Sequence, residues 1–304
     1  MEMNQKIKAE ALRLGFSHCG IALAEPLDHL RPFYEDYLAR GKHQTLTYIS
    51  TNYERRLNPE LLLPGVKSVV ALLMNYYPPQ LIPEADNYII AKYAWGKDYH
   101  TVMNEKMDDM MAFMEKISPG TPGKVFMDSG PVLEKTWAMR CGTGWLGKNT
   151  LLINRTGGSF YFIGIILTCQ ELVPDPPETD HCGACDRCIK ACPTSALEKP
   201  YELNIAKCLS YQTLENKDNI PAEIMACLGD RIYGCDICQD VCPYNRLAKP
   251  DQHPLFFPSE DLLKMRKKDW EALTGEDFDR LFSDSGIKKK GYRRLMKNLV
   301  SPAK

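Results

Sequence analysis

Two cysteine runs between residues 182 and 243 constrain this chain more than any other feature. The runs are Cys182-x-x-Cys185-x-x-Cys188-x-x-x-Cys192-Pro193 and Cys235-x-x-Cys238-x-x-x-Cys242-Pro243. In bacterial ferredoxins such a run gives three thiolates to one iron–sulfur cluster, and its last cysteine, before proline, binds a second cluster. A zinc site usually pairs two Cys-x-x-Cys units and does not need the cysteine–proline end. The runs therefore predict a module with two four-iron clusters.

The number of cysteines leaves one ligand open. Two such clusters need eight thiolates, and the two runs supply seven. By the crossing pattern, one cluster is held by Cys182, Cys185, Cys188 and Cys242, and the other by Cys192, Cys235 and Cys238. Ile232 occupies the position that would open the second run, so the eighth ligand comes from elsewhere. Cys208 and Cys227 are the nearby candidates, and spacing does not choose between them.

Composition places the chain in a reducing compartment. Its 304 residues include 12 cysteines, and residues 1–6 lack the apolar core of a secretion signal. Cysteines in such a chain indicate metal binding rather than disulfides. The longest apolar run, residues 160–168, suits a buried strand and is too short for a membrane span. We therefore expect a cytoplasmic protein that does not enter a membrane.

Hydrophobic periodicity in the first 170 residues predicts a mixed α/β domain without internal repeats. Helices are expected over residues 3–14, 27–40, 101–117 and 131–140, and strands over 16–23, 67–74, 124–127, 150–154 and 159–168. The last two strands flank Arg155-Thr156-Gly157-Gly158, which reads as a hairpin turn. The methionine stripe along 101–117 is typical of core packing rather than of a cofactor site.

The chain divides into three expected parts. A stiff, proline-rich linker at residues 173–177 separates an α/β domain, residues 1–172, from the cluster module, residues 173–250. A helical segment follows over residues 251–304, and it has no acidic residue after Asp284. Its basic residues include Lys288, Lys289, Lys290, Arg293, Arg294 and Lys297. Such a run is either a solvated helix face or a patch that contacts phosphates, and this tail alone does not settle which.

The stretch from Met127 to Asn149 holds the richest polar motifs outside the clusters. Its glycines fit a dinucleotide fingerprint, but a predicted helix precedes them where a strand is required. A P-loop is excluded because Asn149 replaces the magnesium-binding Ser or Thr. Asp128, at a strand end, is either a turn or N-cap residue or a proton donor at the mouth of a crevice. The aromatic loop at residues 93–100 either lines a cofactor pocket or plugs onto the core.

Taken together, these motifs resemble the epoxyqueuosine reductase family. The matching motifs are Asp128-Ser-Gly-Pro-Val-Leu-Glu134, Gly144-Trp-Leu-Gly-Lys-Asn149, His181-Cys-Gly-x-Cys through Pro193, and Tyr233-Gly-Cys-Asp-x-Cys-Gln-x-Val-Cys-Pro243. The resemblance extends from the N-terminus to about residue 300 and includes Arg55–Pro59 and Cys208–Glu215. The cysteine motif indicates the cofactor, whereas the motifs around Asp128 and Lys148 indicate the family.

The resemblance implies an oxidoreductase that reduces epoxyqueuosine to queuosine at the wobble position of tRNA, the last step of queuosine synthesis. It implies an α/β (α+β) cobalamin-binding domain of the reductive-dehalogenase type, a ferredoxin-like module with two 4Fe–4S clusters, and a short helical C-terminus. The implied partners are the tRNA anticodon stem-loop and an external electron donor such as a flavodoxin or ferredoxin system. A monomer is expected.

The resemblance also implies site residues. It selects Cys208 as the eighth cluster ligand and Asp128 as the proton donor above the cobalt. The cobalamin-binding positions that it implies are Arg56, Asp128, Lys148, Asn149 and Ser210. Many family members continue into a HEAT-like repeat beyond the position of Lys304, so the basic tail is expected to replace any tRNA contact of that extension.

Three other interpretations compete with this one. A reductive dehalogenase would use the same cofactors on a small molecule, but such enzymes usually carry a twin-arginine signal, which this sequence lacks. A ferredoxin-like electron-transfer protein would leave the first 170 residues and Asp128 without a role. A cobalamin carrier would not need two clusters.

Overall fold

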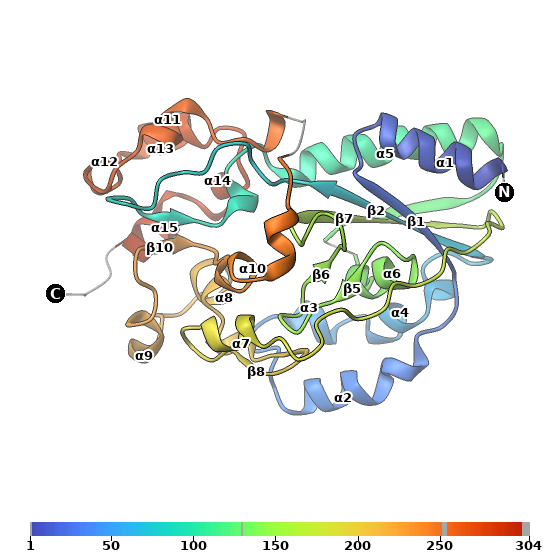
Figure 1. The fold of residues 1–304 in the computed structure, drawn as a ribbon, viewed down its shortest axis with the longest axis horizontal. Helices are drawn as coiled ribbons and strands as arrows, with labels where there is room; N and C mark the ends of the chain where they lie inside the picture. The colour runs from blue at the N-terminus through green and yellow to red at the C-terminus, as the bar shows by residue number, and fades with distance from the viewer. Residues whose placement is uncertain (1, 129, 251–253, 300–304) are drawn as a thin grey trace.

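This computed structural model describes residues 2–128, 130–250 and 254–299, and its central element is a four-stranded antiparallel sheet (Figure 1). The strand order is β1 (His18–Leu23), β2 (Ser68–Asn75), β7 (Tyr161–Thr168) and β4 (Gly123–Phe126). The inner strands β2 and β7 pair along their whole length, from Ser68 opposite Thr168 to Asn75 opposite Tyr161. Because helices cover both faces of β2, this strand is apolar at consecutive positions rather than at alternate ones.

Two long helices cover one face of the sheet, α1 (Glu2–Arg13) and α5 (Tyr99–Ile117) (Figure 1). The expected methionine stripe of α5 is buried in this layer, which confirms its role in core packing. Close packing explains a glycine in β7, because a Cβ on Gly164 would lie only 2.4 Å from the sulfur of Met107.

Short helices cover the other face, and α6 (Glu134–Arg140) lies closest to the sheet, with Trp137 buried against it. The helix expected over residues 27–40 is a 3-10 turn, η1 (Asp28–Leu30), followed by α2 (Arg31–Ala39). The remaining elements of this layer are α3 (Thr47–Ser50), α4 (Tyr53–Leu57) and η2 (Pro59–Leu61).

One expected hairpin is wrong. Strand β6 (Leu152–Ile153) pairs with β5 (Trp145–Leu146) in a separate small sheet, and only a single bridge, Asn154 to Gly158, spans the expected turn. Gly144 permits this arrangement, since a Cβ there would lie 2.3 Å from the carbonyl oxygen of Ile153. The helix expected from Pro131 begins later, at Glu134.

The cluster module consists of short elements beside this domain. In order they are α7 (Arg187–Ala191), β8 (Leu197–Lys199), β9 (Glu202–Leu203), η4 (Ile205–Lys207), α8 (Leu209–Leu214), α9 (Ala222–Met225), β10 (Arg231–Tyr233), α10 (Ile237–Asp240) and η5 (Pro243–Leu247). The linker is fixed to the first domain, because Asp175 accepts a hydrogen bond of 2.9 Å from the backbone N–H of Ile21 and pairs with Lys8 at 2.5 Å.

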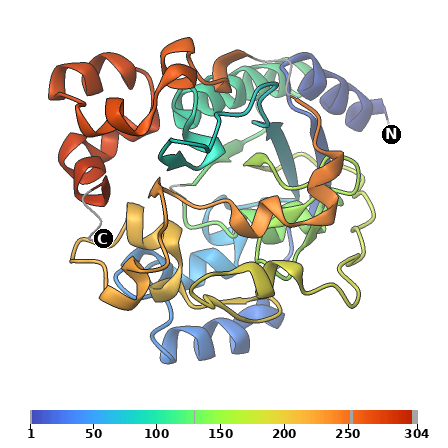
Figure 2. The same cartoon turned by 60° about the vertical axis from the view of Figure 1, so that its left-hand side comes forward.

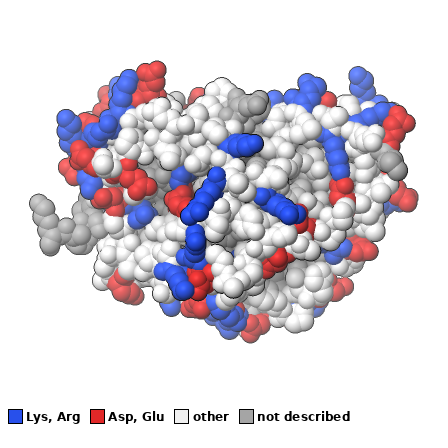
Figure 3. All heavy atoms as spheres, in the orientation of Figure 1, with Lys and Arg blue, Asp and Glu red and all other residues white. Residues whose placement is uncertain are grey.

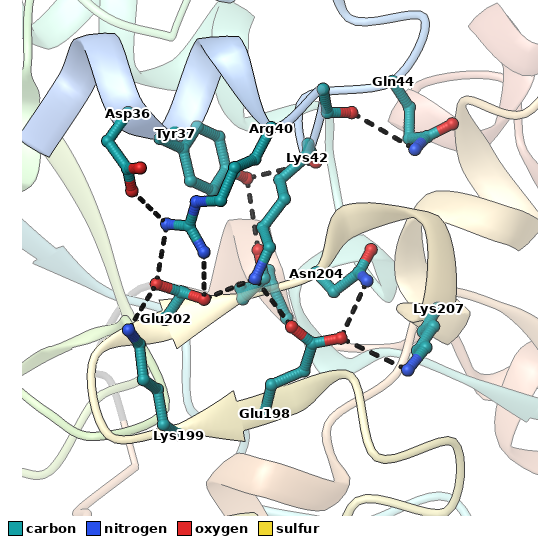
Figure 4. Close-up of polar contacts among 12 residues, drawn as sticks. Asp36, Tyr37, Arg40, Lys42, Gln44, Glu198, Lys199, Glu202, Asn204 and Lys207 are labelled. Carbon is teal, nitrogen blue, oxygen red and sulfur yellow. Dashed lines mark hydrogen bonds and ion pairs between the residues drawn. The ribbon is translucent and has the colours of Figure 1, made fainter.

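An ion-pair network joins the module to α2 (Figure 4). Glu202, only 3% exposed, accepts two hydrogen bonds of 2.9 Å from Arg40 and also binds Lys42. Lys42 reaches Glu198 at 2.6 Å as well, so it connects both strands of the β8–β9 hairpin to the first domain. Hydrogen bonds from Arg40 and then Lys42 hold the pKa of Glu202 far below its usual range.

The C-terminal helices form a lobe of their own (Figure 2). They are η6 (Pro254–Phe256), α11 (Glu260–Lys264), α12 (Lys267–Glu271), α13 (Gly275–Leu281), α14 (Gly286–Lys290) and α15 (Tyr292–Leu299). Their core includes Trp270 and Phe282 and extends to Trp95, just after η3 (Lys92–Ala94). Nearby, β3 (Ile89–Ile90) pairs in parallel with β10 of the cluster module. Residues 82–95 therefore tie all three expected parts together. No helix in the described ranges combines the length and apolar character that crossing a membrane requires.

Candidate active site and cluster-binding cysteines

The first group of thiols combines the first three cysteines of the first run with the last cysteine of the second run. Burial raises the pKa of Cys188, and the thiols of Cys182 and Cys242 raise it further. The pKa of Cys242 is likewise raised by burial and then by Cys182 and Cys185. The same four cysteines line one cavity. The structure thus brings together the set that the crossing pattern predicts for one cluster.

The second group contains Cys208. Burial raises the pKa of Cys238, and the thiols of Cys235 and Cys208 add to this rise. Burial raises the pKa of Cys235 to about 11, again with Cys208 as a contributing neighbour. Burial raises the pKa of Cys208 as well, and the thiol of Cys192 adds to this rise. Cys208 therefore lies among the three cysteines for which the sequence left one ligand open.

The other candidate for the eighth ligand has a different environment. Cys227 lies just after α9, and its thiol faces the carbonyl oxygen of Glu223 at 3.4 Å. By contrast, backbone N–H groups of Tyr211 and Ser210 point at the sulfur of Cys208, and that of Ala196 lies 3.2 Å from the sulfur of Cys192. Hydrogen bonds of this kind stabilise thiolates and help set the potential of a bound cluster.

A single zinc ion and a four-iron cluster make different demands on their thiol ligands. Within the described ranges, no set of three or more His, Cys, Asp or Glu side chains gathers closely enough to hold one metal ion. Zinc needs its sulfur ligands at about 2.3 Å from one point. A four-iron cubane is larger and takes one thiolate at each of its corners, so it needs thiols that surround a wider space. The cavity among the first four cysteines fits this requirement.

Asp128 lies two residues after the end of β4, on a turn with an unusual backbone. Its φ of 58° lies in the left-handed region, which costs roughly 1–3 kcal/mol for a residue with a side chain. It does not cap the following helix, because the residue before α6 is Leu133. The Asp128 side chain is 59% exposed and accepts hydrogen bonds from Tyr99 at 2.6 Å and His100 at 3.1 Å. Backbone strain of this kind clusters at functional sites.

The aromatic loop divides between two environments, and the packing of one part onto the core is confirmed. Trp95 is buried in the C-terminal core, so that part of the loop plugs onto the fold. Tyr99 and His100 instead face Asp128, and their rings stack with a centroid separation of 4.1 Å. Tyr99 also stacks on Phe162 of β7 at 4.4 Å, which fixes the direction of its hydroxyl group. Sequence reasoning did not single out His100, and only its place in an aromatic, polar loop pointed to it.

The protonation states at this site are coupled. The hydrogen bond from His100 lowers the pKa of Asp128 against the effect of burial, and Tyr99 adds to the lowering. In return, the bond to Asp128 raises the pKa of His100. Burial raises the pKa of Tyr99 strongly, so its phenol stays a hydrogen-bond donor. Of the two groups, His100 therefore binds the shared proton more tightly than Asp128 does.

Unsatisfied polar groups lie near Asp128. Glu134 Oε1 and Arg56 Nε are buried without a hydrogen-bond partner in the described part of the chain, and Arg56 is otherwise held by the carbonyl oxygen of Tyr48 at 2.7 Å. Burial raises the pKa of Glu134 to about 7, with a further contribution from Asp128. Buried groups of this kind normally have partners. A bound cofactor rich in amide groups, such as a corrin, fits them.

The other positions expected around a corrin lie toward the cluster module. Lys148 donates hydrogen bonds to the carbonyl oxygens of Gly183 and Cys185, at 2.5 and 2.9 Å. Asn149 donates to the carbonyl oxygen of Cys238 at 3.2 Å, and Ser210 lies in the first turn of α8, beside Cys208. These contacts hold both cysteine groups against the first domain. They do not bring these three side chains to Asp128.

Most of the basic tail is engaged within the fold, and even Lys288 lies 3.7 Å from Asp279. Arg294 donates to the carbonyl oxygens of Gln212 and Thr213, and Lys297 donates to that of Asp218. Lys289 forms an ion pair with Asp98 at 2.5 Å, and Lys290 forms one with Glu215 at 2.6 Å. The side chains of both lysines remain accessible. Lys288 and Arg293 are exposed. Figure 3 adds a second positive feature, a broken column of Lys and Arg side chains down the middle of the face over α7 and α10.

Fold and cysteine geometry together define the class of protein. A family model described as "4Fe-4S double cluster binding domain" matches residues 181–245, and one described as "Epoxyqueuosine reductase QueG, DUF1730" matches residues 56–129. This is an iron–sulfur oxidoreductase that joins an α+β domain to a double-cluster module.

Full-length relatives identify the family. Epoxyqueuosine reductases of Cellulophaga algicola and Leadbetterella byssophila are 44% and 42% identical, and the alignments cover 96% and 98% of this chain and 95% and 98% of theirs. The chain belongs to the epoxyqueuosine reductase family, which separates it from simple electron-transfer ferredoxins and from cobalamin carriers.

Solved structures of the family share the fold. A crystal structure of epoxyqueuosine reductase with an epoxyqueuosine-modified tRNA stem loop has a TM-score of 0.90 at 30% identity, covering 98% of this chain and 80% of that one. The enzyme from Bacillus subtilis, in a form with its catalytic aspartate loop swung out of the active site, has a TM-score of 0.86 at 29% identity, with the same coverage.

Proposed function

We propose that this chain reduces epoxyqueuosine in tRNA to queuosine, with cobalamin and two 4Fe–4S clusters as cofactors. The observation that carries the proposal is the strained acidic turn at Asp128, which lies beside unsatisfied polar groups in a chain that matches the family over its whole length. The Bacillus subtilis relative supports it, because that protein has a catalytic aspartate loop that moves.

The reaction needs a proton donor in the site. Converting the epoxide to an alkene breaks two carbon–oxygen bonds, consumes two electrons and two protons, and releases the oxygen as water. Cobalamin, when bound, supplies a two-electron nucleophile in its cobalt(I) form, and the clusters carry the electrons one at a time. Asp128 protonates the departing oxygen, a task that contributes about 10²–10⁴-fold to rates in other enzymes.

Residues of the first domain would hold the corrin. Arg56 Nε and Glu134 Oε1 would bond to its amide groups, and Glu134, whose pKa is raised to about 7 by burial, donates while it is protonated. Asn149 and Ser210, which lie next to the second cysteine group, would border the corrin on the cluster side. We assign Lys148 mainly to the placement of the first cysteine run, because its ammonium group is engaged there.

We propose two cluster sites with eight cysteine ligands, namely Cys182, Cys185, Cys188 and Cys242 for the first, and Cys192, Cys208, Cys235 and Cys238 for the second. Asn149 connects the second site to the first domain through the carbonyl oxygen of Cys238. Because both cysteine groups are held against the first domain, the clusters, when bound, would carry electrons from an external carrier such as a flavodoxin or ferredoxin to the corrin site. In this proposal the cofactor cleft belongs to residues 1–172 and the clusters belong to residues 173–250. Part of the tRNA surface belongs to residues 251–304.

We infer that the accessible part of the basic tail contacts the tRNA anticodon stem-loop. Lys288 and Arg293 are exposed, and α14 lies next to the active-site residues through Lys289. Phosphates bind Lys and Arg by releasing counterions, so this contact weakens with salt. The modified base leaves its stack to reach the cleft, as bases do in other enzymes that act on them. The proposed form is a monomer.

The experiment is complementation. A bacterial strain that lacks epoxyqueuosine reductase accumulates epoxyqueuosine in its tRNA, and nucleosides from digested tRNA report the product. Expression of this chain should replace epoxyqueuosine by queuosine, whereas the Asp128→Asn variant, made at equal level, should not. Unchanged epoxyqueuosine with the soluble, cluster-loaded wild-type chain would contradict the proposal.

A further inference from the structure

His100 lies between two carboxylates. Its Nδ1 is 2.7 Å from Asp98 Oδ1, and its Nε2 is 3.1 Å from Asp128 Oδ2. The Asp98 side chain is 8% exposed, and it also pairs with Lys289 of α14 at 2.5 Å. His100 itself is 32% exposed, so solvent reaches its ring. The four side chains form a continuous line from Asp128 to the basic segment.

The two ring nitrogens have different tasks. Burial opposes the charge on Asp98, but Lys289 and His100 outweigh it and lower its pKa, so this carboxylate stays ionised. Asp98 also caps α5 by accepting from the backbone N–H of His100, which fixes its place relative to the ring. An ionised carboxylate at Nδ1 holds a proton on that nitrogen. Nε2 is then the nitrogen that exchanges a proton with Asp128.

We propose that His100 reloads Asp128 with the protons that the reaction consumes, which makes it a second proton-transfer residue of this site. In each transfer the Nε2–H bond breaks as an Oδ2–H bond forms, and Asp128 then gives that proton to the substrate oxygen. The neutral imidazole regains a proton from solvent. The inference rests on the proposed function, because deoxygenation needs two protons per substrate while the resting pair holds one.

Most of the surrounding groups favour the ionised form of Asp128, which is the form that accepts a proton from His100. Tyr99 donates to the same Oδ2 as His100, so Asp128 keeps one oxygen available for substrate. Lys290 also acts on Asp128 and favours its ionised form. Glu134 lies close enough for its negative charge to disfavour the ionisation of Asp128. Because burial raises the pKa of Glu134 to about 7, Glu134 is largely neutral below that pH. Tyr48 of α3 also lies within range of the Asp128 charge, so the titratable groups that face the pair come from α3, α5, α6, α14 and the turn after β4.

The test uses cluster- and cobalamin-loaded enzyme with a modified stem-loop, and single-turnover rates measured between pH 6 and 9. His100→Gln should slow deoxygenation about a hundredfold, and the fall in rate with rising pH through the His100 pKa should disappear. Imidazole should restore part of the rate to His100→Ala. The control is His29→Gln, an exposed histidine on η1, which should keep the wild-type rate and profile.

A second readout does not depend on turnover. Carbon-13 NMR of histidine-labelled, oxidised holoenzyme should show His100 titrating above its ordinary pKa of about 6.5, with a lower value in Asp128→Asn and Asp98→Asn. A wild-type rate and pH profile in His100→Gln would overturn the proposal. So would a slow variant with an unchanged profile and no rescue by imidazole, because His100 would then only shape the site. If wild-type enzyme removes no oxygen from the stem-loop, the proposed function fails instead, while the titration still tests the coupling.

Discussion

Glu202→Gln should weaken the contact between the cluster module and the first domain, and should therefore lower the stability of the folded protein. The carboxylate is 3% exposed and binds Arg40 through two hydrogen bonds of 2.9 Å, Lys199 at 3.1 Å, and Lys42. Removing one partner of a buried ion pair costs about 3–5 kcal/mol. Arg40 and Lys199 are 34% and 64% exposed and regain water, whereas Lys42, 13% exposed, is left beside a neutral amide. We therefore expect a loss at the lower end, about 3 kcal/mol.

Anaerobic thermal unfolding of cluster-loaded protein, followed by circular dichroism, measures this loss. About 3 kcal/mol corresponds to a fall in Tm of roughly 5 °C for a chain of this size. The matched control is Glu54→Gln, because Glu54 makes a similar two-bond pair with Arg31, at 2.8 and 3.0 Å, on the surface. Such exposed pairs contribute about 0–1 kcal/mol. Equal Tm values for the two variants would refute the reasoning.

The same network predicts a pH dependence. Lys42 and its neighbours lower the pKa of Glu198 to about 2, and the pKa of Glu202 is lowered as well. Carboxyls with lowered pKa values stabilise the folded state above their unfolded pKa, about 4.3, and lose that contribution as pH falls through the folded values. The difference in stability between wild type and Glu202→Gln should therefore shrink as pH falls from about 4.5 toward 2. A constant difference over that range would contradict the ion-pair explanation.

Three further predictions concern the cofactors and tRNA. Wild-type protein should contain about eight iron atoms per chain. By iron, sulfide and visible-spectrum analysis, Cys208→Ser should lose or degrade one cluster, and Cys227→Ser should keep both. The reverse result would show that the eighth ligand is wrong. Asp128→Asn should keep both cofactors yet lose turnover by roughly a hundredfold or more, and full activity would reduce this residue to a turn position. The double variant Lys288→Ala, Arg293→Ala should raise KM for tRNA more than it lowers kcat, with a smaller salt dependence of binding; normal binding at physiological salt would place the tRNA surface elsewhere.

Patterns with short range were predictable from the sequence. The continuous apolar run of β2 follows from burial on both faces, and the α5 methionines from packing against β7. Cysteine spacing predicted which thiols of the two runs would come together, because a cluster requires its ligands at fixed places in a tight loop. It did not select the eighth ligand, since Cys208 reaches the second group through the fold of η4 and α8.

Contacts between distant segments were not predictable. The partner of β6 depends on a close backbone approach at Gly144, which no hydrophobic pattern reports. His100 became a candidate only when β4 and α5 placed it 3.1 Å from Asp128. In the basic tail, charge did not distinguish Arg294, which is bound to backbone carbonyls, from exposed Arg293. A charge pattern shows how many cations a helix carries, but not which of them the fold already uses.

The most direct measurement is nucleoside analysis after a single turnover. Purified protein, loaded with both cofactors and reduced under anaerobic conditions, would be mixed with an anticodon stem-loop that carries epoxyqueuosine, and the digested RNA analysed by mass spectrometry. We expect that epoxyqueuosine disappears and queuosine, lighter by one oxygen atom, appears in equal amount, at a rate that Asp128→Asn lowers by roughly a hundredfold. Intact epoxyqueuosine in the wild-type reaction, with both cofactors bound and reduced, would contradict it.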